Sequence, residues 1–190
     1  MKSVVLCEGK DDHWFIAYYL HKVAGWDTCD SPWSSYKILA KKHQKVTYME
    51  KGNDSVAIWC VGGKNCFDLA VSTIFTKFIA DYPIDPIDSI VIVQDRDDDT
   101  IDDVLTKMQG WIPPRIALTN KEASIWNTEI EGYDLSIKIT PLVIPFLEAG
   151  AIETLLLESI SEQDSEGKVI VAGANEYIDN LLKEPLIGER

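Results

Sequence analysis

Two short apolar runs that end in acidic residues constrain the fold of this chain more than any other feature. Residues 3–7 (SVVLC) lead directly into Glu8, and residues 87–95 (IDSIVIVQD) hold four consecutive apolar residues before Gln94 and Asp95. Continuous apolar runs of this length are typical of strands covered on both faces, as in a mainly parallel sheet. We therefore predict a buried strand at each run, with acidic side chains at its carboxyl end.

Helical patterns alternate with the predicted strands. Apolar residues recur at helical spacing from His13 to Val23, and Asp11 or Asp12 is the expected cap of that helix. The other elements that we predict are helices at 65–80 (with Asn65 as its N-cap), about 99–109, 149–160 and 175–186, a short helix near 36–42, strands at 45–50 and 55–61, and a hairpin at 123–139. This alternation predicts an α/β fold of Rossmann-like layers, in which helices flank a mostly parallel central sheet and the hairpin adds an antiparallel edge.

Length and composition favour one domain that spans residues 1–190. We place its core at about 3–160 and a C-terminal helical extension at about 161–190. No apolar stretch approaches the roughly 20 residues of a membrane span, and the first residues do not resemble a signal peptide, so we expect a cytoplasmic protein without a membrane partner. The four cysteines lack metal-ligand spacing, and we predict reduced core thiols.

Charge is distributed unevenly along the chain. The formal net charge is −13, which would repel a polyanion from a uniform surface. Six of the nine residues at 95–103 are Asp, whereas positions 37–51 hold five of the eighteen basic residues. The basic segment and its aromatic neighbours Trp26, Trp33 and Tyr36 form either a platform for nucleic-acid bases or anchors for an insertion, and the pattern favours the anchors. The remaining tryptophans are interpreted as packing residues.

The acidic strand ends predict a cation site. Carboxyl ends of neighbouring parallel strands meet at one edge of a sheet, so Glu8 and Asp95 would share a crevice with Asp12 and Asp97. Each pair at about 5 Å would repel by ~3 kcal/mol at an effective dielectric near 20. Either some carboxyls are protonated or a divalent cation lies among them, and we predict the cation. The other acids of this segment, Asp98, Asp102 and Asp103, are interpreted as stabilising a helix N-terminus.

A glycine pair stands where the strand at 55–61 ends. Gly62, Gly63 and Lys64 lack the flanking residues of a nucleotide triphosphatase loop, because Ile58 occupies the position of its first glycine. The segment is either a backbone site for a phosphate, helped by Lys64, or a tight turn with a solvated lysine.

Together these residues resemble a known family. Glu8-Gly9-x-x-Asp12 after the first strand and Asp95-x-Asp97 after a later strand are similar to the two acidic motifs of the Toprim domain. The segments VGGKN and GAIETLLLE more closely resemble small stand-alone Toprim proteins, related to the nuclease half of the overcoming-lysogenization-defect (OLD) family. The resemblance extends from Ser3 to about Ile160, and it implies a Toprim-like fold.

The resemblance also implies a metal centre. By this resemblance, Glu8, Asp95 and Asp97 would bind one or two Mg²⁺ or Mn²⁺ ions. Glu8 would also serve as general acid or base, and Asp12 would support the metal directly or through water. Lys64 matches a position where a cation steadies the scissile phosphate.

A further acid is implied from a late helix. Glu153 matches best, with Glu148 and Glu158 as rivals, and the alternative for all three is a solvated helix face.

The leading functional expectation is a Mg²⁺- or Mn²⁺-dependent phosphodiester hydrolase that acts on DNA or RNA. No ATPase half is evident, so any coupling to ATP would need a separate partner protein. One alternative is a binding module that holds a nucleotide or nucleic acid at the same metal without cutting it. A second is a structural or toxin-neutralising partner protein, which would not respond to metal.

Overall fold

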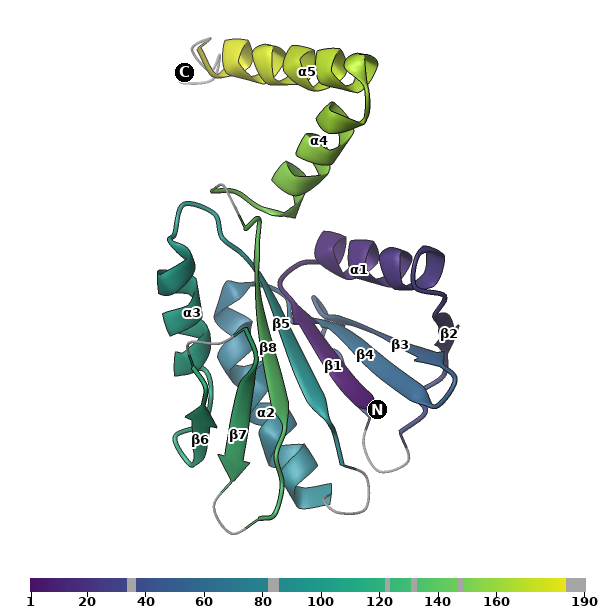
Figure 1. Ribbon diagram of the computed structural model, residues 1–190, viewed down its shortest axis with the longest axis vertical. Helices are drawn as coiled ribbons and strands as arrows, with labels where there is room; N and C mark the ends of the chain where they lie inside the picture. The colour runs from purple at the N-terminus through teal and green to yellow at the C-terminus, as the bar shows by residue number, and fades with distance from the viewer. Residues whose placement is uncertain (34–36, 82–85, 122–123, 131–132, 147–148, 184–190) are drawn as a thin grey trace.

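The protein is built around one eight-stranded sheet, with strand order β2-β3-β4-β1-β5-β8-β7-β6 (Figure 1). The computed structural model describes residues 1–33, 37–81, 86–121, 124–130, 133–146 and 149–183. The strands are β1 (Lys2–Cys7), β2 (Asp27–Cys29), β3 (Lys45–Lys51), β4 (Asp54–Cys60), β5 (Ser89–Asp95), β6 (Ile116–Thr119), β7 (Trp126–Ile130) and β8 (Lys138–Ile144).

Four parallel strands form the centre of the sheet. β1 pairs in parallel with β4 on one side and with β5 on the other, and β5 pairs in parallel with β8. Antiparallel strands extend both edges, β3 and β2 beyond β4, and β7 and β6 beyond β8. The predicted α/β fold with a mostly parallel core is therefore confirmed.

The hairpin at 123–139 was only partly predicted. β7 and β8 are antiparallel neighbours, as expected, but β8 is an inner strand that runs parallel to β5. The antiparallel edge consists instead of β7 and the short strand β6, which was not predicted. The expected turn, Glu131-Gly132, lies outside the described residues.

Helices cover both faces of the sheet. One face carries α1 (Lys10–Lys22), and the other carries α2 (Phe67–Asp81) and α3 (Ile101–Gly110), as Figure 1 shows. The β1 side chains divide between these layers: Val4 and Leu6 join the core beside α2 and α3, whereas Val5 and Cys7 join the core beside α1. Burial on both faces explains why the sequence of β1 is apolar without alternation.

Three predicted helix starts differ from the structure. α1 begins at Lys10 with Gly9 as its N-cap, so neither Asp11 nor Asp12 has that position. Asn65 is not an N-cap, because Lys64–Cys66 form a short 3₁₀ turn, η1, before α2. α5 (Ser165–Lys183) begins ten residues before the predicted segment, and α4 (Ile152–Gln163) starts close to its prediction.

The short helix predicted near residues 36–42 is wrong, since residues 37–41 adopt no regular structure. The backbone N–H of Ile38 donates to Tyr48 Oη at 2.9 Å, a bond to a neighbouring strand rather than within a helix. Ile38 itself is buried in the core. Tertiary contacts therefore decide the conformation of this segment.

α4 and α5 project beyond the carboxyl edge of the sheet and pack against each other (Figure 1). The single-domain boundaries at 1–190, with a core at 3–160, stay a prediction. Among the described residues, every helix is too short or too polar to cross a membrane.

Cysteine and tryptophan side chains follow most of the predicted pattern. Cys7, Cys29, Cys60 and Cys66 are all free thiols. Trp33 is buried, meets the Tyr48 ring edge-on and donates from Nε1 to Ser55 Oγ at 3.0 Å, so it anchors the insertion. Trp14 was wrongly predicted to be a packing residue: it is 55% exposed, with Lys45 Nζ 3.3 Å from its ring centroid. Tyr36 lies outside the described residues.

Candidate functional site

Glu8 and Asp95 leave the sheet at the same edge. β1 and β5 are adjacent and parallel, with Leu6 paired to Ile92, so continuing this register places Glu8 beside the last residues of β5. Neighbouring strands lie about 4.8 Å apart. The predicted meeting of the two acidic strand ends therefore follows from the topology of the sheet.

Glu8 follows the last residue of β1 and contacts the turn after β4. The backbone N–H groups of Gly62 and Gly63 both donate to the Glu8 carbonyl at 3.1 Å, which holds the turn against this strand end. Glu8 Oε2 is buried and has no hydrogen-bond partner among the described residues. Burial raises the pKa of Glu8, the Lys64 ammonium opposes that rise, and the Asp95 and Asp12 carboxylates add to it.

Asp12 enters the same region from the first turn of α1. Its Oδ2 accepts the Gly9 N–H at 2.7 Å, which closes the N-terminus of the helix and fixes the side chain. Only 6% of the residue is exposed. Burial raises the pKa of Asp12, and the nearby Glu153 carboxylate raises it further. Asp12 is therefore held beside other acids in a poorly solvated position.

Asp95 is the most perturbed of these carboxyls. Burial, followed by repulsion from Asp12 and Glu153, raises its pKa to about 6. Its Oδ1 accepts the backbone N–H of Ile152 at 3.1 Å, a bond that favours the charged form and limits the rise. Asp95 thus joins β5 to the N-terminus of α4.

Asp97 connects the same two segments through its backbone. Its N–H donates to the Gly150 carbonyl at 2.6 Å, and the Gly150 N–H donates back at 2.7 Å. Asp97 has a left-handed φ of 50°, which is uncommon for a residue other than glycine. Its carboxylate forms an ion pair with Lys64 Nζ. The Asp97 backbone therefore orders the loop, while its side chain meets the lysine.

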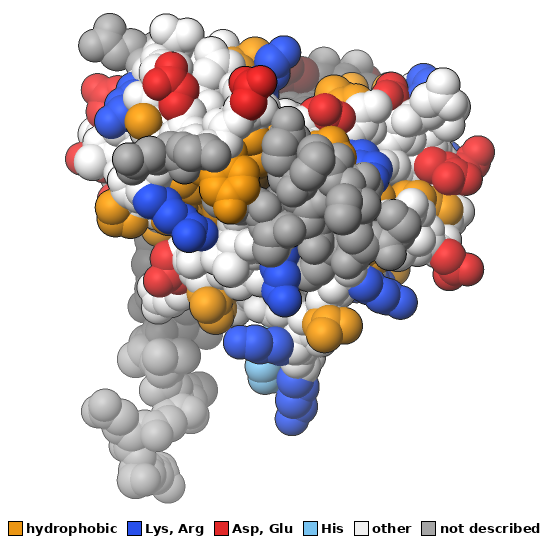
Figure 2. Space-filling model, turned by 90° about the horizontal axis from the view of Figure 1, so that it is seen from below, with side chains coloured by type: hydrophobic (Ala, Val, Ile, Leu, Met, Phe, Trp, Pro, Cys, Tyr) orange, Lys and Arg blue, Asp and Glu red, His pale blue; other side chains and the backbone are white. Residues whose placement is uncertain are grey.

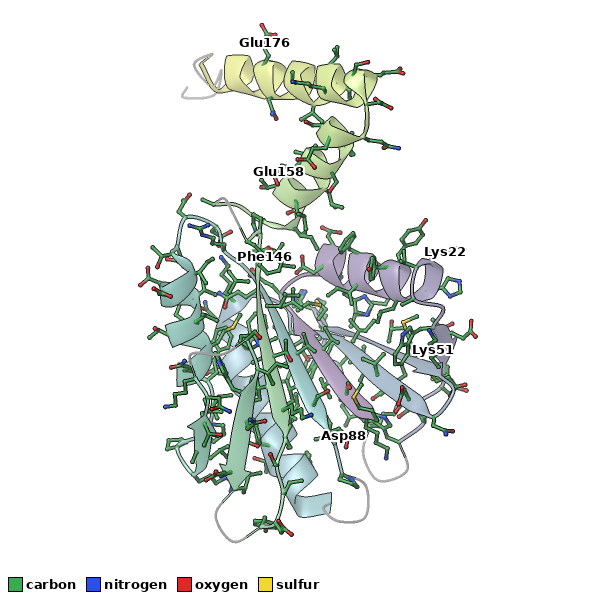
Figure 3. All side chains as sticks on the ribbon, viewed as in Figure 1. Lys22, Lys51, Asp88, Phe146, Glu158 and Glu176 are labelled. Atoms are coloured by element: carbon green, nitrogen blue, oxygen red, sulfur yellow. The ribbon has the colours of Figure 1, made fainter. Side chains whose placement is uncertain are left out.

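Of the three late glutamates, Glu153 is electrostatically coupled to the site. It lies in the first turn of α4, and its charge raises the pKa of both Asp12 and Asp95. Glu158 lies farther along α4, in the part that projects from the sheet (Figure 3). Glu148 lies outside the described residues. The choice of Glu153 as a ligand stays a prediction.

The comparisons with known proteins identify a family. The family model described as "Protein of unknown function (DUF3226)" matches residues 2–187. The chain belongs to the DUF3226 family. No curated protein matches it significantly.

One solved structure resembles this DUF3226 chain, the crystal structure of hypothetical protein PH0156 from Pyrococcus horikoshii OT3. The TM-score is 0.64 at 16% sequence identity, and the alignment covers 100% of this chain and 83% of that chain. At this identity the likeness shows the fold alone.

The donor chemistry of this DUF3226 site suits a hard divalent cation. Carboxylate oxygens are the ligands that Mg²⁺ and Mn²⁺ prefer, and Glu8 Oε2 is a buried oxygen that lacks a partner. In the present conformation, however, no three acidic, histidine or cysteine side chains of the described residues lie close enough together to hold a metal ion. The Lys64 ammonium supplies the positive charge instead. Metal binding would therefore require the Lys64–Asp97 ion pair to open.

Sequence reasoning missed the backbone contribution to the site. Gly150 adopts a φ of 144°, and a Cβ at this position would collide with the Thr154 hydroxyl. The glycine therefore allows both the pairing with Asp97 and the tight entry into α4. A glycine just before an amphipathic helix was the available signal, but its partner, 53 positions earlier, could not be inferred from local pattern.

Asp98, Asp102 and Asp103 do not join the cluster. Thr100 is the N-cap of α3, and Asp103 accepts hydrogen bonds from its hydroxyl and backbone N–H, which lowers the pKa of Asp103. This agrees with the predicted role for Asp102 and Asp103, which lie in the first turn of α3, whereas Asp98 is exposed in the turn before the helix. His13 and His21, on α1, are also separate: His13 is buried, and His21 hydrogen-bonds the Trp26 carbonyl at 2.8 Å.

Proposed function

We propose that this protein is a divalent-metal-dependent phosphodiester hydrolase of Toprim type that acts on DNA or RNA. The observation that carries the proposal is the crowding of Glu8, Asp12 and Asp95 at one edge of a parallel sheet. The pKa values of all three carboxyls are raised, that of Asp95 to about 6. The charged forms are therefore destabilised in this site, and a bound cation would offset that cost. The resemblance of Glu8-Gly9-x-x-Asp12 and Asp95-x-Asp97 to the acidic motifs of Toprim domains supports the same function.

The proposed ligands are Glu8, Asp95 and Asp97, with Asp12 and Glu153 in support and Mg²⁺ or Mn²⁺ as the ion. When bound, a divalent ion supplies positive charge that favours the attack of water on a phosphodiester. Hydrolysis forms one P–O bond to water and breaks the P–O bond to the leaving sugar oxygen, which takes up a proton. The residues of this chain must then transfer the proton and neutralise the negative charge on the phosphate.

Glu8 is the proposed general acid or base. Because its pKa is raised, the Glu8 carboxyl can gain and lose a proton closer to neutral pH. Its buried Oε2 has no hydrogen-bond partner among the described residues and is free to accept that proton. Lys64 is the proposed phosphate-binding residue. Its ammonium now pairs with Asp97 and would move to a non-bridging phosphate oxygen when a metal replaces it beside the carboxylate.

A cleavage assay tests this proposal. The purified chain, with Mg²⁺ or Mn²⁺ added, is incubated with linear duplex, nicked duplex and single-stranded DNA and with RNA, and the products are separated on gels. We expect cleavage of at least one substrate, abolished by EDTA and reduced about 100-fold or more by Glu8→Gln or Asp95→Asn. Asp98→Asn is the matched control, because Asp98 is an exposed acid in the same loop and should leave activity unchanged.

The main alternative is a module that binds a nucleotide or nucleic acid without cutting it. The net charge of −13 favours this alternative with a small ligand, because it disfavours tight, extended contact with a polyanion. Metal-dependent ligand binding with no product on any substrate would decide for this alternative.

A further inference from the structure

A second site lies on the α2 face of the sheet, away from the acidic cluster. It is a pocket of about 350 Å³ between α2 and the segment at 37–44. Trp59 of β4 lines it from the sheet, Leu69 lines it from α2, and Leu39 lines it from the segment. A volume of this size falls in the range of small-ligand sites.

The pocket is basic in an otherwise acidic chain. Lys37, Lys41 and Lys77 line it, and none of its described lining residues is Asp or Glu, although the chain has 31 acidic and only 18 basic residues. Lys37 and Lys41 are exposed, and neither forms an ion pair among the described residues. Figure 2, seen from below, shows basic side chains gathered in the lower middle of the face, with acidic side chains mainly along its upper and right margins. Three lysines around one pocket favour an anionic ligand.

The walls of the pocket also suit an apolar ring. Leu39 is 81% exposed and Leu69 is 53% exposed, and both line the pocket. Two large aliphatic side chains left in water beside a hollow form a surface that a flat, apolar group can cover. The ligand should therefore combine an anionic group with a ring.

Trp59 brings an unpaired buried donor to the residues that line the pocket. The residue is only 5% exposed, and its Nε1 is buried without a hydrogen-bond partner among the described residues. Buried donors are rarely left unpaired, because the lost hydrogen bonds to water must be replaced. A ring nitrogen or carbonyl oxygen of a ligand would be an acceptor for this indole if the ligand reached Nε1.

Gln44 connects the pocket to the turn that carries Lys64. Its Nε2 donates to the Val61 carbonyl at 2.9 Å, and its Oε1 accepts the Lys41 N–H at 3.1 Å. The lysine-bearing segment is therefore fixed to the end of β4, three residues before Lys64. The wall of the pocket formed by this segment is therefore held in place by hydrogen bonds.

We propose that this pocket binds a mononucleotide without the help of a divalent metal. Lys37, Lys41 and Lys77 hold the phosphate, the base lies against Leu39 and Leu69, and an acceptor on the base meets Trp59 Nε1. Lysine is suited to this role as a mobile point charge for phosphate oxygens. This inference does not rest on the hydrolase proposal, because none of the described residues that line the pocket belongs to the acidic cluster.

Calorimetric titration with AMP in EDTA tests the proposal. We expect saturable binding with one site per chain, and an affinity that falls between about 50 and 200 mM salt because the contacts are largely ionic. The double variant Lys37→Glu/Lys41→Glu should weaken binding at least about tenfold. Lys22→Glu/Lys121→Glu is the matched control, because it makes the same charge change at two exposed lysines outside the pocket and should bind AMP normally.

A second variant tests the indole separately. Trp59→Phe keeps a ring but removes the N–H, and should weaken AMP binding about fivefold while leaving phosphate binding unchanged. Both lysine variants change only surface side chains, so the test survives if Trp59→Phe fails to fold. Circular dichroism and a thermal melt check each variant.

Titrations with other ligands separate the possible results. Weaker binding of inorganic phosphate and of adenosine than of AMP supports the proposal. Tighter binding of a 5′-phosphorylated dinucleotide than of AMP also supports it, and identifies a strand end as the source of the nucleotide. Absence of AMP binding at millimolar concentration, equal binding of phosphate and AMP, or an equal loss in the control variant would overturn it.

Discussion

The Asp95 carboxylate accepts a hydrogen bond from the backbone N–H of Ile152 at 3.1 Å, and so caps a helix that starts 57 positions later in the chain. The N-cap residue of α4 is Ala151, whose side chain cannot accept a hydrogen bond from the first turn of the helix. The central strand β5 therefore holds the first turn of α4, including Glu153, over the acidic edge of the sheet. One carboxylate thus orders the helix and belongs to the candidate metal centre.

The raised pKa of Asp95 predicts an unusual pH dependence of stability in the metal-free protein. Because burial raises this pKa from 3.8 to about 6, the folded state binds more protons than the unfolded state between these values. The contribution of Asp95 to the free energy of unfolding is thus largest below about pH 4 and is lost as the pH rises through about 6. Thermal melts in EDTA across this range should show the loss.

Asp95→Asn is the variant that isolates this effect. The amide cannot ionise, so the fall in melting temperature between about pH 4 and 6 should be smaller than in the wild type. Asp98→Asn should keep the wild-type profile. Identical profiles for Asp95→Asn and the wild type would show that Asp95 does not titrate in this window.

Lys64→Met should increase the affinity of the site for Mn²⁺. Removing the ammonium takes away the partner of Asp97 and a positive charge that stabilises ionised Glu8, so a divalent cation gains the attraction that the lysine had supplied. We expect Mn²⁺ to bind up to about tenfold more tightly, measured by titration near neutral pH. If Lys64 contacts the phosphate, cleavage by the same variant should fall.

Lys107→Met is the control for that experiment. Lys107 also pairs with an acid of the loop after β5, since its Nζ lies 2.5 Å from Asp99 Oδ2. Its removal should leave Mn²⁺ affinity and cleavage unchanged. Weaker Mn²⁺ binding by Lys64→Met would contradict the proposed competition between lysine and metal.

Gly150→Ala should destabilise the protein by about 1–3 kcal/mol. The new Cβ would meet the Thr154 hydroxyl, and a φ of 144° is strained for alanine. Denaturant unfolding measures the loss in free energy of unfolding.

Gly110→Ala provides the comparison for Gly150. Gly110 is the last residue of α3 and a Cβ there has open space, so this substitution should be neutral or stabilise by up to about 1 kcal/mol. Equal free energies of unfolding for the two variants would show that the Asp97–Gly150 pairing does not constrain the backbone.

The parts of the fold that sequence predicted are those with a local physical cause. Burial on both faces leaves β1 and β5 apolar throughout, and an acid directly after each run marks the strand end without any knowledge of the tertiary structure. The rule that parallel strands share a carboxyl edge then brings Glu8 and Asp95 together. These steps need only the strands and their neighbours.

The parts that sequence missed depend on distant contacts. Ile38 is held out of a helix by a hydrogen bond to Tyr48, and the Gly9 N-cap uses the side chain of Asp12 as its acceptor. The bond between Asp95 and Ile152 and the pairing of Asp97 with Gly150 join residues more than 50 positions apart. Periodicity and propensity contain no information on such pairs.

Titration of the metal-free protein with Mn²⁺ in a calorimeter near neutral pH tests the central claim most directly. We predict saturable binding of one or two ions per chain, abolished by Glu8→Gln and by Asp95→Asn and retained by Asp98→Asn. No heat of binding in the wild type, or equal binding by all four proteins, would contradict a metal centre formed by the acidic ends of β1 and β5.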